Sequence, residues 1–130
     1  MNMTLIVKNI PKLAFGSAVI VAVVIAVLSL EPSGGRPSLN LNDKLHHFIA
    51  YAVFSFLAVL GRHQRGILAV VLFVSAYGVL MEGLQGILPF NRSASWLDII
   101  ANLIGVAGGT LAALVVARVL MAYTSVTSRD

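Results

Sequence analysis

Long apolar runs separated by short polar segments dominate this chain. Each run approaches or exceeds the roughly 20 apolar residues that a helix needs to cross a bilayer. Because the runs are apolar at nearly every position, they do not fit the short alternating strands of a membrane β-barrel. We therefore predict an all-α fold, a polytopic membrane protein with a four-transmembrane-helix bundle that forms one domain over residues 1–130. The predicted spans are residues 13–30, 45–61, 67–88 and 96–121.

The connections between the runs contain residues that end or begin helices. A segment rich in Pro, Gly, Ser and Asn follows the first run, and Pro89 closes the third. Ser95 is a predicted N-cap of the fourth helix. Lys8 and Lys12 precede the first run, as in a signal peptide, but the run is longer than a usual signal h-region and no Ala-x-Ala site follows it. We predict a retained helix.

The composition agrees with a membrane protein and leaves little chain for a soluble domain. Hydrophobic residues make up 58% of the chain and charged residues 11%. The net charge is +4, but the basic residues are scattered singly and form no patch with aromatic residues, so we predict no nucleic-acid partner. The absence of Cys excludes disulfides, a thiolate nucleophile and Cys-based metal sites.

The distribution of Lys and Arg predicts the orientation in the membrane. If the N-terminus is cytoplasmic, three basic residues fall outside, namely Arg36, Lys44 and Arg92, and six fall inside, namely Lys8, Lys12, Arg62, Arg65, Arg118 and Arg129. Cytoplasmic segments carry the excess of Lys and Arg in membrane proteins. We therefore predict that both termini are cytoplasmic.

Nearly all of the polar residues within the runs lie at one membrane level. In a four-span chain the start of span two, the end of span three and the start of span four lie on the same side. These places contain Asp43, Lys44, His46, His47, Tyr51, Glu82, Gln85, Arg92, Ser95, Asp98 and Asn102. Spacings of three and four place each set on one helix face. Since a charge within a span costs about 2.5–3.5 kcal/mol, such groups face a partner or a water-filled cavity. We predict a polar pocket that opens to the extracytoplasmic side.

Three segments in this order carry a resemblance to a known family. They are Asp43-Lys44-Leu45-His46-His47-Phe48-Ile49-Ala50-Tyr51, then Glu82-Gly83-Leu84-Gln85, then Arg92-Ser93-Ala94-Ser95-Trp96-Leu97-Asp98 with Asn102 and Gly105. The set resembles the VanZ-like family of small bacterial membrane proteins over about residues 43–109, and His46 lies outside the family's pattern. The resemblance implies a multi-pass protein of the bacterial cytoplasmic (inner) membrane. It also implies an envelope function, since the family is named after a member linked to teicoplanin resistance.

The candidate chemistry follows from the residue types at the polar level. His47 is a general acid or base that Asp43 or Asp98 would orient, and Glu82 is a further catalytic candidate. Lys44 and Arg92 are candidate anion binders, and the rest of the predicted binding wall is Gln85, Tyr51, Ser95 and Asn102. We expect the protein to recognise or process an amphipathic envelope molecule, such as a lipid-linked anion or a lipoglycopeptide, with membrane lipids as partners.

Other interpretations of the same polar residues stay open. In a purely structural interpretation Asp98 pairs with Arg92 or Lys44, Asn102 bridges helices, and Tyr51 and Trp96 anchor the chain at the membrane interface. In another, the protein is a small transporter that uses Glu82 as a proton-coupled carboxylate. The chemistry also allows a metal held by His47, Glu82 and Asp98, but no short ligand motif supports it, and we expect no metal or other cofactor.

Small residues at four-residue spacing predict close helix packing. Ala14, Ala18, Ala22 and Ala26 form one stripe on the first span, and Gly105 and Gly109 share a face with Asp98 on the fourth. Because the polar face of the fourth span points inward, we expect the glycines to pack inside the bundle. The alanine stripe is the candidate surface for a homo-oligomer.

Overall fold

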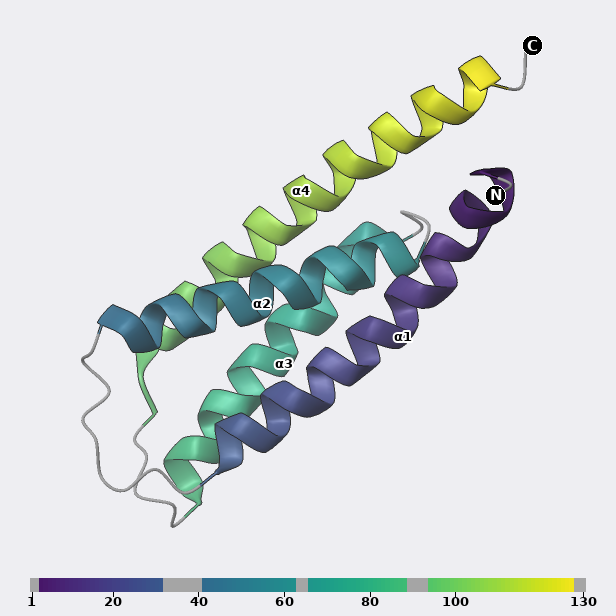
Figure 1. Ribbon diagram of the computed structural model, residues 1–130. Helices are drawn as coiled ribbons and strands as arrows, with labels where there is room; N and C mark the ends of the chain where they lie inside the picture. The colour runs from purple at the N-terminus through teal and green to yellow at the C-terminus, as the bar shows by residue number, and fades with distance from the viewer. Residues whose placement is uncertain (1–2, 32–40, 63–65, 89–93, 128–130) are drawn as a thin grey trace.

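The computed structural model describes residues 3–31, 41–62, 66–88 and 94–127, and these ranges form four helices without a strand (Figure 1). The helices are α1 (Met3–Leu30), α2 (Leu41–Gly61), α3 (Ile67–Ile87) and α4 (Trp96–Thr127). Each contains a stretch long and apolar enough to cross a membrane. The predicted all-α fold with four candidate transmembrane helices is therefore confirmed.

The helices extend further than the apolar runs at several ends. α1 begins at Met3 and continues through Pro11, and α2 begins at Leu41, so that Asp43 lies in the first turn of α2. α4 continues to Thr127. Apolar pattern marks the part of a helix that meets lipid, whereas backbone hydrogen bonding carries the helix on into polar residues. The first-turn position suits Asp43, because a negative charge is favourable at a helix N-terminus.

Successive helices run in opposite directions through the bundle (Figure 1). The ends of α1 and α3 lie at the same end of the bundle as the starts of α2 and α4, and the start of α1 and the end of α4 lie at the other end. α2 packs most extensively against α4 and next against α1. This arrangement brings the three polar segments of the sequence to one level.

The close approach of α2 and α4 depends on two glycines of α4. A Cβ atom added at Gly105 would overlap the carbonyl oxygen of Phe48, and one added at Gly109 would overlap the carbonyl oxygen of Ala52. The backbones are therefore closer than any residue with a side chain would allow at these positions. The expectation that Gly105 and Gly109 pack inside the bundle is confirmed.

The alanine stripe of α1 also faces the bundle interior. Ala14 and Ala18 are buried, and Ala22 and Ala26 pack against the core as partly buried residues. The stripe thus packs largely against the protein's own helices, and its role as a surface for a second copy stays a prediction. Large apolar side chains instead point outward from every helix, among them Val19, Val53, Leu72 and Val115, as lipid-facing residues do.

Candidate functional site

Polar side chains from α2, α3 and α4 gather where α2 and α4 begin and α3 ends. We use the name polar cluster for Lys44, His47, Glu82, Gln85, Ser95, Asp98 and Asn102. Four of them are buried, namely Glu82, Gln85, Asp98 and Asn102. A buried polar group is costly unless it is hydrogen-bonded, so the partners of these groups decide what each can do.

An ion pair between α2 and α4 holds the cluster together. Lys44 Nζ binds Asp98 Oδ1, and the same ammonium lies 3.4 Å from Ser95 Oγ. Asp98 is 2% exposed, so its carboxylate depends on this partner for charge compensation. Of the two partners that the structural interpretation offered for Asp98, the structure has Lys44. The other, Arg92, lies outside the described residues.

His47 is oriented by Asn102, which differs from the prediction. His47 Nδ1 lies 3.1 Å from Asn102 Oδ1, and no such bond joins His47 to Asp43 or Asp98 among the described contacts. An amide oxygen only accepts, so Nδ1 carries the proton and the lone pair of the neutral ring is on Nε2. The expectation failed because spacing along α2 and α4 identifies a shared face but does not choose between Asp98 and Asn102, one turn apart. Asn102 also forms the predicted bridge between helices.

Glu82 joins α3 to the start of α4. The backbone N–H of Ser95 donates to Glu82 Oε1 at 2.5 Å. Ser95 directly precedes α4, and its carbonyl oxygen accepts the N–H groups of Asp98 and Ile99. Glu82 is 2% exposed, and its hydrogen bond with the N–H of Ser95 anchors the chain where α4 begins. This contact gives a predicted catalytic residue a structural role.

The first helix takes part in the site, which the sequence pattern did not predict. Gln85 Nε2 donates to the backbone carbonyl oxygen of Ser29 at 2.9 Å, and this bond joins α3 to the end of α1. Every residue has a backbone carbonyl, so the residue type does not show which carbonyl accepts a hydrogen bond from another helix. Ser29 is only a small polar residue at the end of an apolar run. The signal was therefore too weak to place α1 beside the polar cluster.

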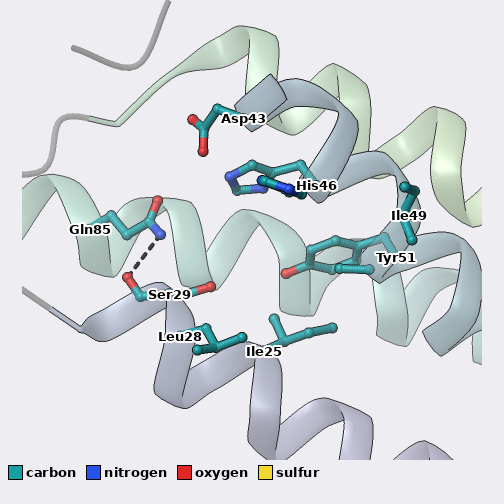
Figure 2. Close-up of a pocket in the computed structure, with 10 residues that line it drawn as sticks. Ile25, Leu28, Ser29, Asp43, His46, Ile49, Tyr51 and Gln85 are labelled. Carbon is teal, nitrogen blue, oxygen red and sulfur yellow. Dashed lines mark hydrogen bonds between the residues drawn. The ribbon is translucent and has the colours of Figure 1, made fainter. Parts of the chain in front are cut away.

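A cavity of about 450 Å³ lies between α1, α2 and α3 beside the polar cluster (Figure 2). Its polar lining consists of Ser29, Asp43, His46, His47, Tyr51 and Gln85, and its apolar lining consists of Ile25, Leu28, Ile49 and Ala50. Figure 2 shows Ile25 and Leu28 on the α1 side, opposite Asp43 and His46 of α2. The lining residues include neither Lys nor Arg. The cavity is therefore lined by both polar and apolar side chains.

Tyr51 is buried in the core and is not an interface anchor. Its exposed fraction is 2%, and its hydroxyl has no hydrogen-bond partner among the described residues. In Figure 2 the hydroxyl is directed into the space between Gln85 and Ile25. Buried donors without a partner are rare in proteins, so this hydroxyl points to a ligand or water in the cavity. Trp96, by contrast, is 69% exposed at the start of α4, as an interface anchor would be.

Gly78 of α3 makes room for two residues of the site. A Cβ atom at this position would lie 3.0 Å from Tyr51 Cε1 and 3.2 Å from Asn102 Nδ2. The absence of a side chain at Gly78 thus lets the Tyr51 ring and the Asn102 amide pack against α3. Because Asn102 orients His47, this glycine indirectly supports the imidazole as well.

Asp43, His47 and Asp98 form a compact group of metal-ligand types. A carboxylate oxygen of each aspartate and one imidazole nitrogen all lie within 4.8 Å of one another. The trio weighed from the sequence contained Glu82 in place of Asp43.

No protein-family model, characterised protein or solved structure matches this chain. The function must therefore be argued from the site itself.

Proposed function

We propose that this chain is a VanZ-like membrane protein that binds the polar head of an amphipathic envelope molecule in the cavity between α1, α2 and α3. The observation that carries the proposal is that polar and apolar side chains line the same cavity. Its volume of about 450 Å³ lies within the range of roughly 300–1,000 Å³ typical of small-molecule sites. A lipid-linked anion or a lipoglycopeptide likewise combines a polar head with an apolar tail.

The distribution of basic residues supports an extracytoplasmic position for this cavity. Lys8 lies near the start of α1, Arg62 directly follows α2, and Arg118 lies in the second half of α4. These parts of the helices lie toward the end of the bundle opposite the polar cluster (Figure 1). The positive-inside rule assigns that end to the cytoplasm. The cavity then opens toward the outer leaflet of a bacterial cytoplasmic membrane, where envelope precursors and antibiotics of the glycopeptide type are found. A role in envelope homeostasis or in glycopeptide resistance is consistent with this location.

Processing of the bound molecule is a second candidate function, and the orientation of His47 favours it. The bond from Nδ1 to Asn102 leaves Nε2 as a proton acceptor at the edge of the cavity. A positioned imidazole of this kind acts as a general base in many enzymes. The nucleophile would be water, because Ser95 is not among the residues that line the cavity.

Proton-coupled transport through Glu82 has less support. Transport needs polar groups across the whole membrane, whereas polar side chains in the other half of the bundle tie helices together. Ser55 Oγ lies 2.8 Å from Thr110 Oγ1, and the Tyr77 hydroxyl donates to the carbonyl oxygen of Ala22 at 2.7 Å. Glu82 itself accepts the N–H of Ser95. These contacts favour binding at one level over passage.

Incubation with a lipid extract followed by mass spectrometry tests the proposal. The purified protein is expected to retain a defined set of amphipathic molecules after washing. The variant Ala50→Leu fills the cavity from α2 and should reduce the retained amount at least tenfold. Ala76→Leu adds the same side chain at an exposed position of α3 and should leave retention unchanged.

The products separate the candidate functions. An unaltered molecule supports binding, and a converted molecule that is missing with His47→Ala supports processing. Retention that is equal in wild type, Ala50→Leu and Ala76→Leu would contradict the cavity as the binding site. Proton-driven uptake into vesicles without lipid retention would favour the transporter instead.

A further inference from the structure

The polar cluster contains a set of atoms suited to one metal ion. Ligand atoms of Asp43, His47 and Asp98 lie within 4.8 Å of one another. Bonds from zinc to nitrogen and oxygen ligands measure about 2.0–2.2 Å, so two ligands on one ion are at most about 4.4 Å apart. The three atoms therefore lie close to the separation that one ion requires.

We propose that Asp43, His47 and Asp98 bind one divalent transition-metal ion of the Zn²⁺ or Mn²⁺ class. One imidazole nitrogen with two carboxylates suits these ions, whereas Ca²⁺ and Mg²⁺ prefer oxygen ligands alone. The three residues come from the first two turns of α2 and the first turn of α4, which the Gly105 and Gly109 contacts hold together. The three ligands therefore lie on two helices that pack closely against each other.

His47 already has the support that metal-binding histidines require. Its Nδ1–H group donates to Asn102 Oδ1, which fixes both the ring orientation and the tautomer. In histidine ligands of metals the second ring N–H almost always donates a hydrogen bond to such an acceptor, which keeps the ligating nitrogen deprotonated. In this chain the bond from Nδ1 to Asn102 leaves Nε2 for the ion.

Lys44 competes with the ion for Asp98. Its ammonium binds Oδ1 of that carboxylate, so a metal would share Asp98 with a positive charge. This neighbour lowers the affinity of the site for a cation. The arrangement makes a definite prediction, since removal of the ammonium must tighten metal binding.

The unpartnered hydroxyl of Tyr51 is an independent sign of a ligand. It lies one turn after His47 on α2, is buried, and is directed into the cavity that Asp43 and His47 also line. A phenol donates to an oxygen atom, such as one on an anion held by the ion. Because no Lys or Arg lines the cavity, an ion at Asp43 and His47 would supply the positive charge that an anionic head group needs.

Metal binding by the purified protein in detergent, without added lipid, tests this site separately from the proposed function. After treatment with a chelator, the protein is titrated with Mn²⁺ and followed by the electron paramagnetic resonance of the free ion. Zn²⁺ binding is measured by calorimetry. The wild type is expected to bind one equivalent of at least one of the two ions.

The variants then locate the ion. Asp43→Asn and His47→Ala should each weaken binding at least tenfold, and Lys44→Met should tighten it several-fold. Glu31→Gln, at the exposed end of α1, and His63→Ala, between α2 and α3 in the sequence, should not change the affinity. Asp43 is partly exposed, so its variant is expected to fold even if an Asp98 variant does not.

Two results would overturn the site. One is the absence of saturable Mn²⁺ and Zn²⁺ binding by the wild type. The other is binding that Asp43→Asn and His47→Ala leave unchanged, which would place the ion elsewhere. Lipid retention without metal binding would contradict the metal site and leave the proposed function standing. Metal binding without lipid retention would support the metal site and contradict the proposed function.

Discussion

Glu82 of α3 accepts the backbone N–H of Ser95 with its carboxylate, at 2.5 Å, and so fixes the point where α4 begins. The first N–H groups of a helix have no partner within the helix and must be satisfied from outside. Here a neighbouring transmembrane helix supplies an acceptor for the residue that precedes the first turn. A carboxylate that the sequence suggested for chemistry thereby joins two spans.

Replacement of Glu82 should therefore affect stability before chemistry. Glu82→Ala leaves the partly buried N–H of Ser95 without this acceptor and is expected to lower the free energy of unfolding by about 1–3 kcal/mol. Glu82→Gln keeps an acceptor oxygen and should have a smaller effect. Thermal unfolding in detergent, followed by circular dichroism, measures both. An unchanged melting temperature together with complete loss of ligand conversion would assign Glu82 to catalysis instead.

The Lys44–Asp98 pair predicts strong coupling between α2 and α4. In metal-free protein Lys44→Met leaves the buried Asp98 carboxylate without its cation and should destabilise the fold by about 3 kcal/mol. The double variant Lys44→Met/Asp98→Asn should recover much of that loss, because the buried charge is gone. A double-mutant cycle of unfolding free energies gives the coupling. Additive effects of the two substitutions would contradict a direct pair.

The contact at Gly109 predicts that alanine substitutions at two neighbouring glycines of α4 differ sharply in their effect on stability. Gly109→Ala places a methyl group against the carbonyl oxygen of Ala52 and should force α2 and α4 apart, at a cost of about 1–3 kcal/mol. At Gly108 the nearest atom to an added Cβ is Phe48 Cε2 at 3.9 Å. Gly108→Ala should therefore be neutral or stabilising, by up to about 1 kcal/mol. Equal unfolding temperatures for the two variants would refute the close packing.

Gly78 predicts a defect in binding that exceeds the defect in stability. Gly78→Ala pushes on Tyr51 and Asn102 and so disturbs the support of His47. We expect weaker retention of the amphipathic ligand and about tenfold weaker metal binding, with a melting temperature only a few degrees lower. Gly83→Ala is the matched control on α3, since nothing lies within 4 Å of its added Cβ. A Gly83→Ala defect as large as that of Gly78→Ala would show that α3 substitutions act nonspecifically.

The orientation can be tested directly because the chain contains no cysteine. Leu41→Cys lies at the exposed start of α2, and Ser125→Cys lies near the exposed end of α4. A membrane-impermeant maleimide should label Leu41→Cys in intact cells and Ser125→Cys only after the membrane is opened. The opposite labelling pattern would place the cavity on the cytoplasmic side.

The sequence alone determined the four helices, their approximate bounds and the common level of the polar residues. Those features follow from local physics: an apolar run of bilayer length must satisfy its backbone internally, and four alternating spans bring the same ends together. The inward position of Gly105 and Gly109 followed as well, because they share a helix face with Asp98. For these elements, spacing along one helix was enough.

Only the tertiary structure decided which polar groups meet. The spacing placed Asp98 and Asn102 on one face of α4. The rotation and depth of α2 against α4 decide that Lys44 pairs with Asp98 and that His47 pairs with Asn102. The role of Ser29 was also hidden, because its contribution is a backbone oxygen. Contacts between helices depend on shifts of a few ångströms that residue types do not encode, so the membrane level could be predicted and the partners could not.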